Sequence, residues 1–268
     1  TTDIIPKLLW AFFLVGLVAS SNYVLNEILD AASDRKHPVK CNRPVASGKV
    51  DVRLGYLEWI LLGIAGVGGS LTLGPAFFYS AAALWVMGCM YNIKPLRSKD
   101  KPYLDVISES VNNPLRLLLG WYATGTSLIP PVSLLLAYWF IGAFFMAVKR
   151  FAEYRRIGDP VRAGEYRLSF RFYNEQRLLT SIIYYVAAFG LFFGIFLIRY
   201  RPELILSIPL IAGVIAWYIN LGFHQDSPVQ YPEKLYRDKG LMILLVVCTF
   251  VMTALMFIDL PWLHELFR

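Results

Sequence analysis

Two carboxylates lie one helical turn apart at the end of a long apolar stretch. The sequence 22–44 reads NYVLNEILDAASDRKHPVKCNRP, and Asn26, Asp30 and Asp34 recur in it at every fourth position. Residues with this spacing share one face of an α-helix. Mg²⁺ takes one or two carboxylates and completes its shell with water and substrate phosphates. The pattern therefore predicts a Mg²⁺ site, with Asp30 and Asp34 as catalytic metal ligands and Asn26 supporting them.

The place of these acids on their helix also calls for a cation. Pro38 disfavours helical geometry in the residue before it, so we expect the helix to end near His37. The C-terminal end of a helix carries partial negative charge, and carboxylates are disfavoured there unless a cation accompanies them. The alternative to a metal is an acidic pair at the membrane interface, neutralised by Arg35 and Lys36.

A second polar face is predicted in the stretch 103–121, which reads YLDVISESVNNPLRLLLGW. A charged residue in mid-bilayer costs about 2.5–3.5 kcal/mol on insertion scales, so such residues usually face a cavity or a partner. The alternative is an ion-pair network between Glu109 and Arg116 that joins helices. Lys94 and Arg97 precede this stretch and could reach a phosphate from a loop. The polar face consists of Asp105, Glu109, Asn112 and Arg116, which recur at i, i+4, i+7 and i+11.

A third cluster ends the stretch FFMAVKRFAEYRR. Lys149, Glu153 and Arg156 share one face there, although the helix dipole alone would favour cations at that position. Carboxylates for Mg²⁺ together with several cations suit a diphosphate ligand. The sequence lacks the G-x-x-x-x-G-K-[ST] loop of P-loop ATPases.

The elements that must position these residues are membrane-length helices. Hydrophobic residues make up 57% of the 268 residues, and the mean hydropathy is +0.51. This composition is typical of a polytopic membrane protein. We expect an all-α transmembrane bundle that forms a single domain over residues 1–268. Its eight predicted spans are 4–29, 54–72, 75–93, 104–125, 130–150, 177–198, 203–222 and 240–259.

Basic residues indicate the orientation of this bundle. Most of the 26 Lys and Arg residues fall in every second connection, in segments 35–53, 94–103, 149–177 and 223–239. The positive-inside rule places these connections, and the candidate site with them, on the cytoplasmic side of the membrane. We expect this membrane to be a bacterial or archaeal inner membrane. The basic and aromatic stretch 162–177 is typical of a segment at the membrane surface, so we expect membrane lipid and no nucleic acid as partner.

The chain resembles the UbiA superfamily of intramembrane prenyltransferases. Asn26, Asp30 and Asp34, followed by Arg43 and Pro44, match the first Asp-rich motif of that family. The stretch YNIKPLRSKDKPYLDV is similar to its tyrosine and basic loop. That similarity implies substrate-binding roles for Tyr91, Lys94, Arg97 and Asp105. Family members have nine helices with the first motif ending the second, so the resemblance implies that this chain lacks the first family helix.

One departure from the prenyltransferase pattern points to a subgroup. Where a second D-x-x-x-D motif is expected, this chain reads Lys149-Arg150-Phe151-Ala152-Glu153. That segment resembles decaprenyl-phosphate phosphoribosyltransferases, as does DRxHPxKxxRP (34–44, with Lys40 and Arg43). Phosphoribosyl diphosphate has a 5-phosphate, absent from prenyl diphosphates, that requires Lys or Arg. Our hypothesis is that Lys149, Arg150 and Glu153 bind the 5-phosphate and hydroxyls of the donor, with Lys94, Arg97 and Arg116 as candidates for the acceptor phosphate. Lys40 and Arg43 are predicted to bind substrate as well.

Three functions remain open from the sequence. The first is Mg²⁺-dependent transfer of a phosphoribosyl group from phosphoribosyl diphosphate to a polyprenyl phosphate. The second is transfer of a prenyl group from prenyl diphosphate to an aromatic or other acceptor, with Asp105 and Glu109 as a second acidic pair. The third is a non-catalytic lipid-binding or transport bundle. The sequence also leaves open whether the protein forms a homo-oligomer.

Overall fold

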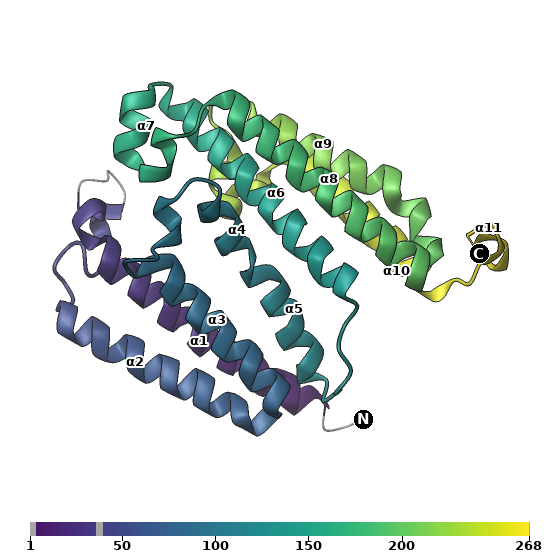
Figure 1. Ribbon diagram of the computed structural model, residues 1–268, viewed down its shortest axis with the longest axis horizontal. Helices are drawn as coiled ribbons and strands as arrows, with labels where there is room; N and C mark the ends of the chain where they lie inside the picture. Colours follow the sequence, from purple (N-terminus) through teal and green to yellow (C-terminus); the bar gives the residue numbers. More distant parts are fainter. Residues whose placement is uncertain (1–3, 36–39, 268) are drawn as a thin grey trace. The chain divides into compact units, whose positions relative to one another are not determined.

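The computed structural model describes residues 4–35 and 40–267, and within these ranges the chain forms helices and no strand (Figure 1). The prediction of an all-α transmembrane bundle is confirmed, and the protein is an integral membrane protein. Contacts divide the chain into two compact units, Thr1–Pro130 and Pro131–Arg268, and the single domain stays a prediction. Among the described residues, six segments are long and apolar enough to cross a membrane: Ile4–Asp34, Val52–Leu73, Val132–Ile157, Glu175–Tyr200, Pro202–Gly222 and Lys239–Phe257. The prediction of eight spans was therefore too high, because the predicted spans 75–93 and 104–125 are not among these six.

The first unit is built on α1, the longest of its helices. α1 packs along α2 and α3, and α5 packs against α3 and α1. The described part of α1 ends at Asp34, and its predicted end near His37 lies outside the described residues. The helices of this unit are α1 (Ile4–Asp34), α2 (Val52–Gly69), α3 (Pro75–Asn92), α4 (Leu104–Ser110) and α5 (Asn112–Ala123).

Glycines on α2 allow α1 to approach closely. A Cβ atom built on Gly66 would lie 2.8 Å from a methyl group of Val18, and one on Gly69 would lie 2.6 Å from Leu14. Leu14 and Val18 are almost fully buried in the resulting core. Small residues commonly bring transmembrane helices together in this way, because lipid offers no hydrophobic drive for helix association.

The predicted span 104–125 is not one continuous helix. α4 ends at Ser110 and α5 begins at Asn112, so the polar residues expected on one helix face are divided between two helices. Pro114 lies in the first turn of α5, where its missing N–H removes the hydrogen bond to the Ser110 carbonyl that a continuous helix would need. Val111 between the two helices has helical φ and ψ of −55° and −27°, and the shared polar face from Asp105 to Arg116 stays a prediction.

The second unit is built on α6 and α8, which pack along their length. α6 runs seven residues past its predicted end at 150, so the segment Lys149–Glu153 is helical. Gly158 ends α6 with a φ of +70°, the left-handed conformation that glycine favours at a C-terminal cap. The helices of this unit are α6 (Val132–Ile157), α7 (Pro160–Tyr166), α8 (Glu175–Tyr200), α9 (Ile208–Gly222), α10 (Lys239–Phe257) and α11 (Pro261–Leu266).

Candidate functional site

Three side-chain oxygens surround the ammonium group of Lys99 in the first unit. Lys99 Nζ lies 2.6 Å from Asp30 Oδ1, 2.8 Å from Asn92 Oδ1 and 3.1 Å from Asn26 Oδ1. Asn26 and Asp30 belong to α1, Asn92 is the last residue of α3, and Lys99 lies in the 3₁₀ turn Ser98–Asp100. Lys99 is only 7% exposed. Burial lowers its pKa below the ordinary value for lysine, and the Asp30 carboxylate opposes this shift.

The approach of α1 to α3 that creates this cluster depends on a glycine one turn away. Gly88 precedes Asn92 by four residues on α3, and Asn22 precedes Asn26 by four residues on α1. Gly88 and Asn22 therefore lie on the helix faces that carry the cluster. The Asn22 side chain occupies the space where a Cβ of residue 88 would be. Asn22 Nδ2 also donates to the Leu84 carbonyl at 3.0 Å, which joins the two helices.

Replacing Gly88 with Ala is expected to destabilise the first unit by about 1–3 kcal/mol, because the added methyl group overpacks the contact with Asn22. The measurement is the thermal unfolding temperature of the detergent-purified protein. Gly120→Ala in α5 is the matched control, because no atom lies within 4 Å of a Cβ at that position. Equal unfolding temperatures for the two variants would contradict the expectation.

Arg97 connects the Lys99 cluster to the loop that follows α3. Arg97 Nη2 lies 3.0 Å from Asp30 Oδ1, and Arg97 Nε lies 2.8 Å from Asp100 Oδ2. Its Nη1 donates to the Asn92 carbonyl at 3.2 Å. The backbone φ of Arg97 is +26°, a rarely populated value that is often held at functional sites. Asp30 is thus paired with two cations.

The second carboxylate of the motif has a different cation. Asp34 Oδ2 lies 2.8 Å from Arg43 Nη1, and the Asp34 side chain is 6% exposed. Arg35, the alternative partner, instead donates from Nε to the Ala46 carbonyl at 3.2 Å. Lys36, the other alternative, lies outside the described residues. Arg43 therefore neutralises the charge of Asp34, a role that the alternative hypothesis gave to Arg35 and Lys36.

The remaining predicted residues of the first unit lie around this cluster. The Tyr91 hydroxyl donates to Glu109 Oε2 at 2.8 Å, joining α3 to α4. Asp105 is fully buried in the first turn of α4. The predicted cations differ in exposure. Lys40 is half-buried in the 3₁₀ turn Lys40–Asn42, Lys94 is exposed on the rim of a hollow of about 500 Å³ that Arg97 also lines, and Arg116 is exposed on α5.

The oxygens around Lys99 fit a divalent cation. A carboxylate and two amide carbonyl oxygens are hard ligands of the kind that Mg²⁺ prefers. The Lys99 ammonium takes the place of a metal ion here, and its three contacts show that these oxygens converge on one positive charge. Asn26 and Asp30 were expected at such a site, whereas Asn92 was not. Among the described contacts, none joins an Asp34 oxygen to the Lys99 ammonium.

In the second unit, the predicted segment of α6 forms an internal ion pair. Arg150 Nη1 lies 3.1 Å from Glu153 Oε2, and both side chains are largely buried, with 3% and 12% exposed. Lys149 is half-buried beside them. The aromatic residues Phe170 and Tyr173 of the basic stretch are buried too, and Phe170 packs edge-on against Tyr154 of α6. These two aromatic rings belong to the protein core and do not form an exposed stacking surface.

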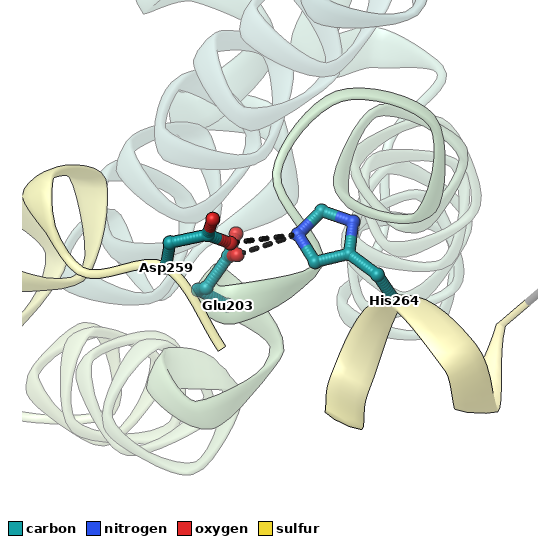
Figure 2. Close-up of side chains that lie close together, drawn as sticks. All are labelled: Glu203, Asp259 and His264. Atoms are coloured by element: carbon teal, nitrogen blue, oxygen red, sulfur yellow. Dashed lines mark hydrogen bonds and ion pairs between the residues drawn. The ribbon is translucent and has the colours of Figure 1, made fainter. Parts of the chain in front are cut away.

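A further polar cluster lies at the C-terminal end of α10. Figure 2 shows the His264 ring directed at Glu203 and Asp259. His264 Nε2 lies 2.7 Å from Glu203 Oε1 and 3.4 Å from Asp259 Oδ1. Two carboxylates and an imidazole can bind a metal, but the shorter contact is a hydrogen bond and the Asp259 side chain is 80% exposed. The cluster acts as a polar clamp between α11 and the 3₁₀ turn Pro202–Ser207.

Arg201 completes this clamp, and Arg201→Leu is expected to destabilise the second unit by about 1–3 kcal/mol. Its guanidinium donates to carbonyls of 255, 256 and 258, which end α10, and its Nε lies 3.6 Å from the buried Glu203. Thermal unfolding measures the effect, with Arg199→Leu as control because Arg199 is an exposed arginine two residues away. A larger loss in the control would contradict this role for Arg201.

Two residues of the candidate site were missed from the sequence. Lys99 was counted among the basic residues that set orientation, because Lys94, Arg97 and Lys101 surround it in the chain. Asn92 directly follows Tyr91, a predicted site residue, but an isolated asparagine at a helix end commonly serves as a cap. One feature of the sequence could have indicated Asn92. Gly88 and Asn92 have the same spacing of four residues as Asn22 and Asn26.

Comparison with known proteins identifies the family. The model of the UbiA prenyltransferase family matches residues 2–246. The decaprenyl-phosphate phosphoribosyltransferase of Mycobacterium tuberculosis is 30% identical over 164 residues, which cover 60% of this chain and 52% of the relative. The nodulation protein NoeC of Azorhizobium caulinodans is 32% identical over 174 residues, which cover 62% and 54%. The matches thus span about half the length of these curated relatives.

The fold agrees with this family. The structure of a UbiA homolog from Archaeoglobus fulgidus bound to DMAPP and Mg²⁺ aligns with a TM-score of 0.73 and 18% sequence identity. The alignment covers 94% of this chain and 88% of that protein. The family resemblance noted in the sequence is confirmed. With the family model matching nearly the whole chain, the protein belongs to the UbiA prenyltransferase family.

Proposed function

We propose that the protein transfers a phosphoribosyl group from 5-phosphoribosyl diphosphate to a polyprenyl phosphate in the membrane, releasing diphosphate. The observation that carries this proposal is the convergence of Asn26, Asp30 and Asn92 oxygens on one positive charge, with Arg97 beside it. This arrangement suits a diphosphate that arrives with a divalent cation. The similarity to decaprenyl-phosphate phosphoribosyltransferases, at 30% identity, supports the choice of donor.

The proposed reaction replaces one bond at ribose C1. An oxygen of the polyprenyl phosphate attacks C1, and the bond from C1 to the diphosphate oxygen breaks. C1 develops oxocarbenium character, as in glycosyl transfer generally. The acceptor phosphate is already anionic, so no general base is required. The diphosphate leaves with the electron pair of the broken bond.

The residues of the first unit have distinct proposed roles in this reaction. Asp30 and Asn26, with Asn92, would hold Mg²⁺, and the bound ion would neutralise charge on the leaving diphosphate. Arg97 and Lys99 would donate to the diphosphate oxygens, since both lie at the carboxylate that is proposed to bind the metal. Asp34, held by Arg43, is proposed to bind metal through its other carboxylate oxygen. Lys94 and Arg116, which are exposed, are proposed to bind the acceptor phosphate.

Prenyl transfer to an aromatic or other acceptor is the second candidate. The family name and the fold shared with an A. fulgidus homolog that binds DMAPP and Mg²⁺ favour it. Asp105, which is buried, and Glu109, which accepts a hydrogen bond from Tyr91, could supply a second acidic pair. Against it stands Lys149–Glu153 in α6, where cations replace the first acid that a second metal site would need.

The test offers both donors to the purified protein with Mg²⁺. One reaction contains labelled phosphoribosyl diphosphate and polyprenyl phosphate, and the other contains labelled prenyl diphosphate and 4-hydroxybenzoate. Ribose label in the lipid fraction would support phosphoribosyl transfer, and prenylated benzoate would favour the second candidate. Transfer in neither reaction, by a folded protein, would contradict both assignments of substrate.

A further inference from the structure

Four charged side chains contact one another at the candidate metal position. Two carboxylates, Asp30 and Asp100, contact two cations, Arg97 and Lys99, at distances of 2.6–3.0 Å. Their formal charges cancel. Coulomb attraction depends on net charge, so this group attracts a free divalent cation only weakly. A site that binds its metal before substrate usually offers an excess of negative charge, which these four residues do not provide.

A metal and the Lys99 ammonium would compete for the same oxygens. The ammonium uses Asp30 Oδ1, Asn92 Oδ1 and Asn26 Oδ1 at 2.6, 2.8 and 3.1 Å. Mg²⁺ binds oxygens at about 2.0–2.1 Å in a near-octahedral shell. The two cations cannot occupy one position together, because their mutual repulsion would add to the steric conflict. The flexible four-carbon stem of lysine allows the ammonium to move while its backbone stays in place.

We propose that Lys99 is a built-in counter-ion that excludes the divalent metal until a diphosphate binds. The proposal rests on the proposed function only in that the ligand carries a diphosphate. The diphosphate provides new acceptors for Lys99, and the departing ammonium frees Asp30, Asn26 and Asn92 for the metal. The metal and the diphosphate then strengthen each other's binding, and thermodynamic linkage makes this effect reciprocal.

The test measures Mn²⁺, a probe for Mg²⁺, retained with the detergent-purified protein in ultrafiltration. Inorganic diphosphate serves as the second ligand. The wild-type protein is expected to retain Mn²⁺ weakly alone and strongly when diphosphate is present. Lys99→Met is expected to bind Mn²⁺ without diphosphate about tenfold more tightly than wild type, because the competing charge is gone. The same variant should bind diphosphate less tightly.

Matched variants assign the effect to this site. Lys99→Gln removes the charge but keeps a polar side chain, and we expect it to bind Mn²⁺ as Lys99→Met does. Lys101→Met removes an exposed charge two residues away and should behave like wild type. The double variant Asp30→Asn, Lys99→Met should lose the gained Mn²⁺ affinity. Thermal unfolding identifies variants that are folded, and Mn²⁺ alone should raise the unfolding temperature of the Lys99 variants more than that of wild type.

Two results would overturn the proposal. One is a folded Lys99→Gln or Lys99→Met protein that binds Mn²⁺ no more tightly than wild type without diphosphate. The other is tight Mn²⁺ binding by wild type alone. The assay contains neither phosphoribosyl nor prenyl donor, so its result is independent of which group is transferred. Failure of the proposed function would instead appear in the two-donor assay while the Mn²⁺ results stood.

Discussion

Asp30→Asn is expected to lower the rate of transfer by roughly 10²–10³-fold, the usual cost of removing a charge-stabilising group from an active site. Asp30 is the one carboxylate that contacts both Arg97 and Lys99 among the described ion pairs. The asparagine side chain keeps the shape and one acceptor oxygen but removes the charge that a divalent cation requires. The measurement is kcat/KM for label entering the lipid fraction at saturating Mg²⁺.

The control for this prediction is Asp51→Asn. Asp51 is an exposed carboxylate in the same unit that caps α2 by accepting from the Arg53 N–H. Asparagine also serves at the N-terminal cap of a helix, so the fold should be retained. A similar loss of activity in both variants would mean that transfer depends on the total negative charge of this unit and not on the position of Asp30 in the cluster. Undiminished transfer by Asp30→Asn would exclude it as a metal ligand.

Lys149→Met has the second largest expected effect, which is specific to the donor. If Lys149 binds the 5-phosphate, the KM for phosphoribosyl diphosphate should rise by about 10-fold to 100-fold, since hydrogen bonds to charged groups contribute about 1.5–3 kcal/mol. Inorganic diphosphate has no 5-phosphate, so its inhibition constant should stay near the wild-type value. Steady-state kinetics with inorganic diphosphate as inhibitor measures both quantities.

Lys149 is a better target than its neighbour. Arg150 is 3% exposed and paired with Glu153, so its removal would break the ion pair of a largely buried carboxylate and destabilise the fold. Arg155→Met is the matched control, because it removes an equal charge from an exposed position on the same helix. If Lys149→Met weakened the binding of phosphoribosyl diphosphate and of inorganic diphosphate equally, the 5-phosphate assignment would be wrong. The prenyl-transfer candidate would then gain support.

Much of the fold was decided by local sequence alone. The apolar stretches predicted the membrane helices because a 30 Å hydrocarbon core requires about 20 apolar residues. The spacing of Asn26, Asp30 and Asp34 placed them on one face of α1, since helical periodicity is a local property. The break between α4 and α5 was present in the sequence as Pro114. The apolar content of the stretch hid it, because hydropathy does not register a missing backbone donor.

The partners of the site residues were decided only by tertiary structure. Four basic residues lie between 94 and 101, and nothing in their types shows that Lys99 alone among them is buried beside Asp30 while Lys94 and Lys101 remain exposed. That choice depends on how closely α1 approaches α3 at Gly88 and on the turn that begins with the positive φ of Arg97. The sequence alone determined which groups can bind a metal and a diphosphate. The packing of α1 against α3 decided which of them meet, because side chains 73 residues apart are brought together only by the fold.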